Sequence, residues 1–195
     1  MMKLLLICFV LWTLLSLYFA KSSISSIYTP QWLGPSPLWY EPVMVTHALH
    51  LIRSYRELTG KDLVSKDLAL TNPKAAAKEL FFSPRVIVSH GIQAGPEGPI
   101  LNYGNARALR AWKASWEELT STASIYTADV DNREKRAEVM QKVTENGFVT
   151  DYSGIRIAFD KTKFRIEGVD IWNVVDNDSG LRIGQAATFS EMTLL

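Results

Sequence analysis

The sequence predicts an α+β fold, in which a five-stranded antiparallel sheet packs against helices on one face. After two helical segments, two strand-like segments precede several further helical segments, and three strand-like segments joined by hairpin turns complete the domain. This order of elements favours an antiparallel sheet with its helices gathered on one side. The 195 residues, of which 47% are hydrophobic and 21% charged, suffice for one domain with a sizeable core.

The first predicted helix of the domain is amphipathic. Thr46 is expected to cap a helix over residues 47–58, and Gly60 is expected to end it. Because such a helix can pair with a second copy of itself, it predicts a homodimer. The apolar stripe consists of Leu49, Ile52 and Tyr55.

Capping signals place the next elements. Asn72 and Pro73 begin a second helix, which is followed by an antiparallel pair of strands at residues 85–89 and 100–103. Asn105 is expected to cap a helix over residues 106–113. Residues 115–118, with the sequence Ser-Trp-Glu-Glu, form a capping box that opens another short helix.

The next helix is predicted to be the longest of the domain, with Asp131 or Asn132 as its cap and Gly147 at its end. Acidic residues interrupt and follow the basic residues at 133–136, a mixture that is typical of a solvated helix face. The stripe expected to be buried consists of Val139, Met140 and Val143.

Three strands complete the predicted sheet, at residues 151–160, 163–175 and 181–189, with a hairpin turn at residues 177–180. In the first of them Ile155, Ile157 and Phe159 alternate with Arg156 and Ala158. Gly168 suggests a bulge in the second strand. The residues of this second strand predicted to share one face are Phe164, Ile166, Trp172 and Val174.

The N-terminal segment is strongly apolar. Residues 4–20 carry no charge and are bracketed by Lys3 and Lys21. As a helix they would span about 25 Å, slightly less than a hydrocarbon core of about 30 Å. Residues 1–21 are therefore interpreted as a single-pass membrane anchor, with a cleaved secretory or organelle-targeting signal as the alternative. A Ser/Pro-rich linker at 22–45, the domain at 46–190 and a tail at 191–195 complete the predicted organisation.

Composition excludes several classes of function. The net charge of +1 and the absence of a Lys/Arg cluster argue against nucleic acid as a partner. Cys8 is the only cysteine, so the predicted domain has no disulfide, thiol nucleophile or cysteine metal site. His47 and His50 have a spacing that could hold a metal, but no third ligand is near them in sequence, so no metal site is predicted.

The chain contains no recognisable catalytic motif. It has neither a glycine-rich phosphate-binding loop nor a Gly-x-Ser-x-Gly elbow. Ser89 and His90 are neighbours, but consecutive strand residues point to opposite faces and cannot form a nucleophile–base pair. His90 is instead expected to orient the loop that follows it through hydrogen bonds, and we expect no catalytic residues.

Aromatic and amide residues surround the predicted junction between sheet and helices. Apolar walls with a few convergent polar groups are typical of a small-ligand pocket. The alternative is that the aromatic rings simply fill the core. The candidate ligand-binding residues are Tyr103, Asn105, Trp112, Trp116, Tyr126, Trp172 and Gln185, with Tyr152 nearby.

The chain contains an ordered series of motifs, which include Val-Ile-Val-Ser-His-Gly at 86–91, Asn-Tyr-Gly-Asn at 102–105, Asp-Tyr-Ser-Gly-Ile-Arg at 151–156 and Gly-Gln-Ala-Ala at 184–187. Together these motifs resemble the MEKHLA domain family, which is similar to PAS domains. The resemblance covers residues 46–190 and implies a PAS-like fold. PAS relatives include blue-light flavin sensors, whose photoadduct needs a cysteine that this domain lacks. Gln185 matches the position of a glutamine that contacts the flavin in those sensors, so the resemblance leaves non-covalent flavin binding open.

These observations together predict a non-enzymatic, membrane-tethered PAS-like module for sensing or for protein association, whose ligand is unknown. The alternative is a protein or enzyme that binds a small molecule or a flavin-type cofactor in the aromatic pocket.

Overall fold

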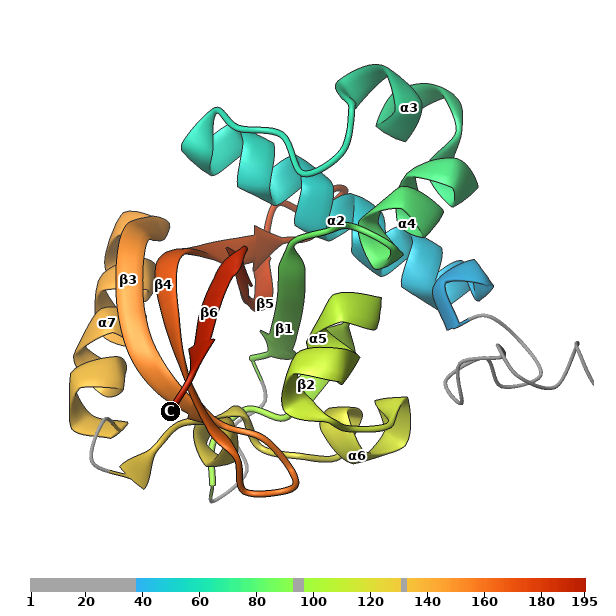
Figure 1. Cartoon of the computed structure of the whole chain (residues 1–195). Helices are drawn as coiled ribbons and strands as arrows, with labels where there is room; N and C mark the ends of the chain where they lie inside the picture. The colour runs from blue at the N-terminus through green and yellow to red at the C-terminus, as the bar shows by residue number, and fades with distance from the viewer. Residues whose placement is uncertain (1–37, 93–96, 131–132) are drawn as a thin grey trace, which may run out of the picture. The chain divides into compact units, whose positions relative to one another are not determined.

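Six strands form a single antiparallel sheet in the computed structural model, which describes residues 38–92, 97–130 and 133–195. The order across the sheet is β2-β1-β5-β4-β3, and β6 pairs with β4 (Figure 1). The antiparallel sheet is confirmed, but the prediction of five strands was wrong. The strands are β1 (Val86–Gly91), β2 (Leu101–Gly104), β3 (Phe148–Ile157), β4 (Lys163–Val175), β5 (Arg182–Phe189) and β6 (Glu191–Leu194).

The additional strand, β6, lies where the sequence predicts a tail. The 13-residue strand β4 pairs with β3 on one side over residues 163–172. On its other side the second half of β4 pairs with β5, and the first half pairs with β6. The sheet therefore uses the last residues of the chain to cover an edge of β4 that β5 does not reach.

Helices lie on both faces of the sheet, so the prediction of one covered face was wrong. Trp172 and Asn173 are consecutive in β4 and point to opposite faces. The ring of Trp172 meets Tyr55 of α2 with 4.8 Å between centroids, whereas Asn173 Nδ2 donates to the carbonyl of Val143 in α7 at 2.9 Å. The helices are η1 (Leu38–Tyr40), α2 (Pro42–Thr59), α3 (Lys66–Thr71), α4 (Pro73–Phe81), α5 (Ala106–Trp112), α6 (Trp116–Thr120), η2 (Ser124–Thr127) and α7 (Arg133–Asn146).

A bulge at Gly168 changes which side chains of β4 share a face. Tyr152 pairs with Val169 and Gly154 pairs with Ile166, so β4 has one residue more than β3 in this interval. Gly168 has a φ of +60°, which glycine adopts without strain. The extra residue reverses the alternation of β4. Phe164 and Ile166 consequently lie on the α7 face, and Trp172 and Val174 do not share that face as predicted.

Local capping signals were mostly reliable. Gly60 ends α2 in the left-handed conformation, the Asn72 side chain caps α4, and Ser115 forms the complete capping box of α6. Helix α2, however, begins at Pro42 rather than after Thr46, because proline fits the first turn of a helix. At 18 residues α2 is also longer than α7, which has 14. Gly147 follows the last residue of α7 as predicted, and the predicted N-terminal caps Asp131 and Asn132 lie outside the described residues.

The apolar side of α2 packs inside the domain. Ile52 and Tyr55 are buried, and Leu49, the third residue of the predicted stripe, is half-buried. This packing accounts for the amphipathic pattern without a second copy of the chain. The homodimer therefore remains a prediction, but the apolar stripe of α2 no longer supports it.

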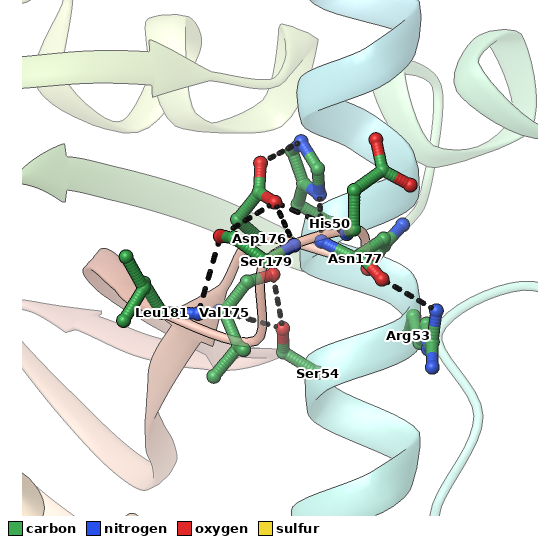
Figure 2. Close-up of polar contacts among 9 residues, drawn as sticks. His50, Arg53, Ser54, Val175, Asp176, Asn177, Ser179 and Leu181 are labelled. Carbon is green, nitrogen blue, oxygen red and sulfur yellow. Dashed lines mark hydrogen bonds and ion pairs between the residues drawn. The ribbon is translucent and has the colours of Figure 1, made fainter.

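Polar contacts also fasten α2 to the turn between β4 and β5 (Figure 2). His50 Nδ1 accepts from the backbone N–H of Asn177 at 3.1 Å, and Arg53 donates to the carbonyl of Asn177 at 3.2 Å. Asp176 Oδ1 accepts from the N–H groups of Asp178 and Ser179, which closes the turn. The hairpin turn at residues 177–180 is therefore confirmed, and it is held against the helix.

The apolar segment at residues 4–20 lies outside the described residues. Within the part of the chain that the structure describes, no helix has both the length and the apolar character needed to span a membrane. The anchor and its alternative, a cleaved signal, remain predictions.

Candidate functional site

A small cavity of about 50 Å³ lies between the α7 face of the sheet and the segment that contains η2 and α7. Ile166 and Ile171 of β4 form part of its wall, although an odd number of positions separates them. The bulge at Gly168 is what allows both to face the same side. Phe189 of β5 and Trp112 of α5 extend this apolar wall.

Two arginines reach the cavity from different elements. Arg136 comes from the first turn of α7, and Arg156 comes from β3. Arg136 Nη2 donates to Ser124 Oγ at 3.1 Å, and Arg156 Nη1 donates to the carbonyl of Ile155 at 3.1 Å. Burial, and then the positive charge of Arg156, lowers the pKa of Arg136 to about 10. The two guanidinium groups are therefore charged and close enough to repel each other.

An amide pair holds α7 against the sheet at the cavity. Gln185 Nε2 donates to Thr144 Oγ1 at 3.0 Å and to Asn173 Oδ1 at 3.1 Å. Asn173 in turn donates to the carbonyl of Val143. Since both amides are buried, each needs these partners. Gln185 lines the cavity, but its N–H groups are already used to position α7.

His90 also lines the cavity, and its hydrogen bond agrees with its predicted role. Its Nδ1 lies 2.9 Å from the carbonyl of Gly91, so that nitrogen is the donor and the ring orients the start of the following loop. Burial lowers the pKa of His90, and the charges of Arg136 and Arg182 act in the same direction. The ring is consequently neutral at pH 7.

The structure brings together only two of the seven candidate ligand-binding residues, Trp112 and Gln185, at this cavity. Trp112 is buried and meets Phe164 and Phe189 edge to face. Tyr126, in η2, has 44% of its surface exposed and does not line the cavity. The predicted aromatic pocket therefore does not form as one site.

The other four candidates lie elsewhere. Trp172 packs under α2, on the opposite face of the sheet. Tyr103 lies between His47 of α2 and Trp116 of α6, with ring centroids 5.8 and 5.9 Å away. Asn105 is fully buried and caps α5 through a hydrogen bond from the N–H of Ala108.

Ser89 pairs with a histidine, but not with its neighbour. His47 Nε2 lies 2.8 Å from Ser89 Oγ, whose hydrogen is donated to Asn102 Oδ1 at 2.7 Å. Burial, and then the charge of His50, lowers the pKa of His47 to about 4. Ser89 is 1% exposed and its proton is held by an amide rather than by a base. This arrangement joins α2, β1 and β2 and does not activate a nucleophile.

Neither arginine is among the candidate site residues predicted from the sequence. Residues 133–136 were interpreted as a solvated helix face, yet Arg136 is partly buried. Arg156 is 8% exposed, whereas the isoleucines on either side of it are only half-buried. In β3 the isoleucines alternate with Arg156, and this pattern predicts that the isoleucines face the core. The sequence alone does not reveal that in this strand the face with Arg156 is the more buried one.

A family comparison agrees with this fold. The sequence matches the model of the MEKHLA domain over residues 45–194. The chain belongs to the MEKHLA domain family. A search of curated proteins found no match to this sequence.

Solved structures support the PAS-like fold of this MEKHLA domain. A PAS domain of a protein from Colwellia psychrerythraea is 16% identical, with a TM-score of 0.50, over 63% of this chain and 95% of that one. An RNA-binding light-oxygen-voltage receptor is also 16% identical with a TM-score of 0.50. That match covers 66% of this chain but only 34% of the receptor. At this level of identity the comparisons concern the fold alone.

The residues of the MEKHLA domain cavity do not fit a flavin. Ligand pockets for molecules of that size have volumes of roughly 300–1,000 Å³, whereas this cavity has about 50 Å³. Gln185, which the family resemblance suggested as a flavin contact, donates instead to Thr144 and Asn173. Trp112 and Phe189 both line the cavity, and their rings meet edge to face with 6.2 Å between centroids.

Proposed function

We propose that this MEKHLA domain is a non-enzymatic sensory module that binds a small polar molecule between its sheet and α7. The observation that carries the proposal is the cavity itself, which combines apolar walls with the side chains of Arg136 and Arg156. Apolar surroundings with a few convergent polar groups are what a small-ligand site needs. The small size of the cavity favours a molecule of only a few non-hydrogen atoms.

The non-enzymatic part of the proposal rests on the arrangement of the histidines. His47 is engaged with Ser89, whose proton is donated to Asn102, and His90 donates to a backbone carbonyl. Among the described residues no group of three or more His, Cys, Asp or Glu side chains could hold a metal ion. Neither His47 nor His90 therefore lies as a base next to a free nucleophile.

Two tryptophans on opposite faces of the sheet provide an internal test. Trp112 lines the cavity, whereas Trp172 packs under α2. The full chain would be purified in detergent with fluorotryptophan, and Trp112→Phe and Trp172→Phe variants would assign the two ¹⁹F NMR signals. A library of small polar compounds should contain at least one that shifts the Trp112 signal saturably and leaves the Trp172 signal in place. If no compound does so, the ligand-binding function is wrong.

We further propose that residues 4–20 tether the module to a membrane. The support is the uncharged apolar run of this segment between two lysines. Cell fractionation of the full chain and of a variant lacking residues 4–20 tests this. The full chain is expected in the membrane fraction with its N-terminus intact by mass spectrometry. A mature chain that begins near residue 21 supports a cleaved signal instead.

A further inference from the structure

The polar part of the cavity wall consists mainly of hydrogen-bond donors. A guanidinium group has several N–H donors, and Arg136 and Arg156 each use only one of theirs on the described residues. The indole N–H of Trp112 is buried and has no acceptor among the described residues. The three side chains come from α7, β3 and α5, and all three line the same small cavity.

The positive charge of this wall is not balanced by the described residues. None of the described residues that line the cavity is an Asp or a Glu. The ion pairs among the described residues do not include Arg136 or Arg156. Asp129, which follows η2, is paired with Lys163 at 2.8 Å. Arg136 is partly buried, and the guanidinium of Arg156 lies over the ring of Tyr152, 5.5 Å from its centroid. Because the two positive charges lie close together, each adds to the cost of burying the other.

We infer that the cavity binds a short-chain carboxylate, such as acetate or propionate, with its carboxylate on Arg136 and Arg156 and its alkyl part against Ile166 and Ile171. This inference rests on the proposed ligand-binding function and specifies the class of ligand. A carboxylate is planar and accepts two parallel N–H bonds from a guanidinium, which makes this pairing stronger than one between neutral groups. A cavity of about 50 Å³ has room for a ligand of only a few non-hydrogen atoms, such as acetate or propionate.

Binding of this kind would connect α7 to the sheet. Arg136 belongs to α7 and Arg156 to β3, so one carboxylate between them bridges the two elements. Of the α7 residues whose side chains are described, only Val143 is fully buried, and the helix is otherwise held through Asn173 and Gln185. Occupancy of the cavity is therefore expected to slow amide hydrogen exchange in the first turns of α7.

Matched pairs of probes test the carboxylate directly. Acetate and propionate would be compared with acetamide and propionamide, which have the same shape but no charge. The full chain in detergent would be titrated at constant ionic strength, with the ¹⁹F signal of Trp112 and the midpoint of thermal unfolding as readouts. Both carboxylates should shift the Trp112 signal saturably and raise the midpoint, and the amides should do neither at the same concentrations.

Arginine variants locate the effect. Arg136→Gln and Arg156→Gln should each weaken carboxylate binding about tenfold or more, since each removes charged hydrogen bonds. Arg110→Gln is the matched control, because Arg110 is an exposed arginine of α5 that does not line the cavity. If either glutamine variant fails to fold, Arg136→Lys replaces it, because lysine keeps the positive charge but cannot form two parallel hydrogen bonds to a carboxylate. The comparison of carboxylates with amides in the natural sequence also tests the inference without any variant.

The outcomes separate the two proposals. Equal responses to carboxylates and amides, or unchanged affinity in both folded glutamine variants, overturn the carboxylate inference. Saturable binding of nitrate or phosphate without binding of acetate and propionate overturns it as well. If neutral compounds shift the Trp112 signal and carboxylates do not, the ligand-binding function stands and the carboxylate inference is wrong. If no compound shifts it, both are wrong.

Discussion

Ser54 and Val175 are joined by two hydrogen bonds through a single hydroxyl group. Ser54 Oγ donates to the carbonyl of Val175 at 3.3 Å and accepts from its backbone N–H at 2.9 Å. The contact lies where α2 crosses the end of β4 (Figure 2). One helical side chain thereby satisfies both backbone groups of a strand residue at the point where the strand leaves the sheet.

Loss of this hydroxyl should weaken the attachment of α2. Ser54→Ala leaves two backbone groups of Val175 without their partner, and we expect a loss of about 1–2 kcal/mol in the free energy of unfolding. Urea denaturation measures it. Arg53→Ala is the control, because Arg53 is exposed and water can replace its contacts with Glu57 and with the carbonyl of Asn177, so its loss should cost less than that of Ser54. Equal losses in the two variants would contradict this assignment.

The depressed pKa of His47 predicts a loss of stability in mild acid. The unfolded chain takes up a proton on this side chain near its ordinary pKa of about 6.5, whereas the folded chain takes it up only at about 4. Stability from His47 is therefore complete above about pH 6.5 and is lost as the pH falls toward 4. The whole shift corresponds to about 3 kcal/mol.

Unfolding by urea at pH 7 and pH 4.5 measures this effect. His47→Gln, which keeps an N–H donor for Ser89 but cannot be protonated, should lose clearly less stability between the two pH values than the natural sequence. The variant is expected to retain some dependence on pH, because the pKa of His90 is lowered too. Identical losses in both proteins would show that His47 does not supply this dependence.

Asn105 should be among the most sensitive polar residues of the domain. Its Oδ1 accepts from the N–H groups of Ile87 and Ala108, and its Nδ2 donates to the carbonyl of Arg85 at 2.8 Å. Asn105→Ala leaves these groups buried without partners, so we expect a loss of about 3 kcal/mol or more.

The matched control for Asn105 is Asn72→Ala, which removes a cap of the same type from α4. Asn72 is exposed, so water can replace its hydrogen bond, and the loss should be about 1 kcal/mol. Thermal or urea unfolding of both variants gives the comparison. A cost for Asn105→Ala no greater than that for Asn72→Ala would rule out the buried network as its cause.

The burial of Ser89 predicts that it does not react as a nucleophile. A fluorophosphonate probe, which labels activated serines, should leave Ser89 unmodified in the folded chain, as judged by peptide mass spectrometry. A known serine hydrolase serves as the positive control. Ser89→Ala should instead reduce stability, by about 1–2 kcal/mol, because His47 and Asn102 lose their common partner. Labelling of Ser89 would revive the alternative of an enzyme.

Local features of this fold could be predicted from sequence because each depends on a few neighbouring residues. The cap at Asn105, the capping box at Ser115 and the left-handed end at Gly60 all involve side chains and backbone groups within about one helical turn. The hairpin turn closed by Asp176 is local in the same sense.

The candidate site depended on relationships that are not local. Trp172 was placed on the wrong face because one bulged residue reverses the alternation for the rest of β4. Tyr103 contacts His47 and Trp116, which are distant in sequence. Arg136 and Arg156 belong to a helix and a strand whose facing is fixed only when α7 packs on the sheet. Charge patterns along the chain do not carry that information.

Because of the extra residue at Gly168, a change of even one residue in the length of β4 alters which side chains face each side of the sheet. Deletion of one residue there would turn the second half of the strand over, so that the indole of Trp172 would enter the cavity and the amide of Asn173 would lie under α2. Deletion of two residues would preserve the facing but misalign the β4–β5 turn with α2. Tolerated changes in the length of this domain should therefore be found in its loops and not in this strand.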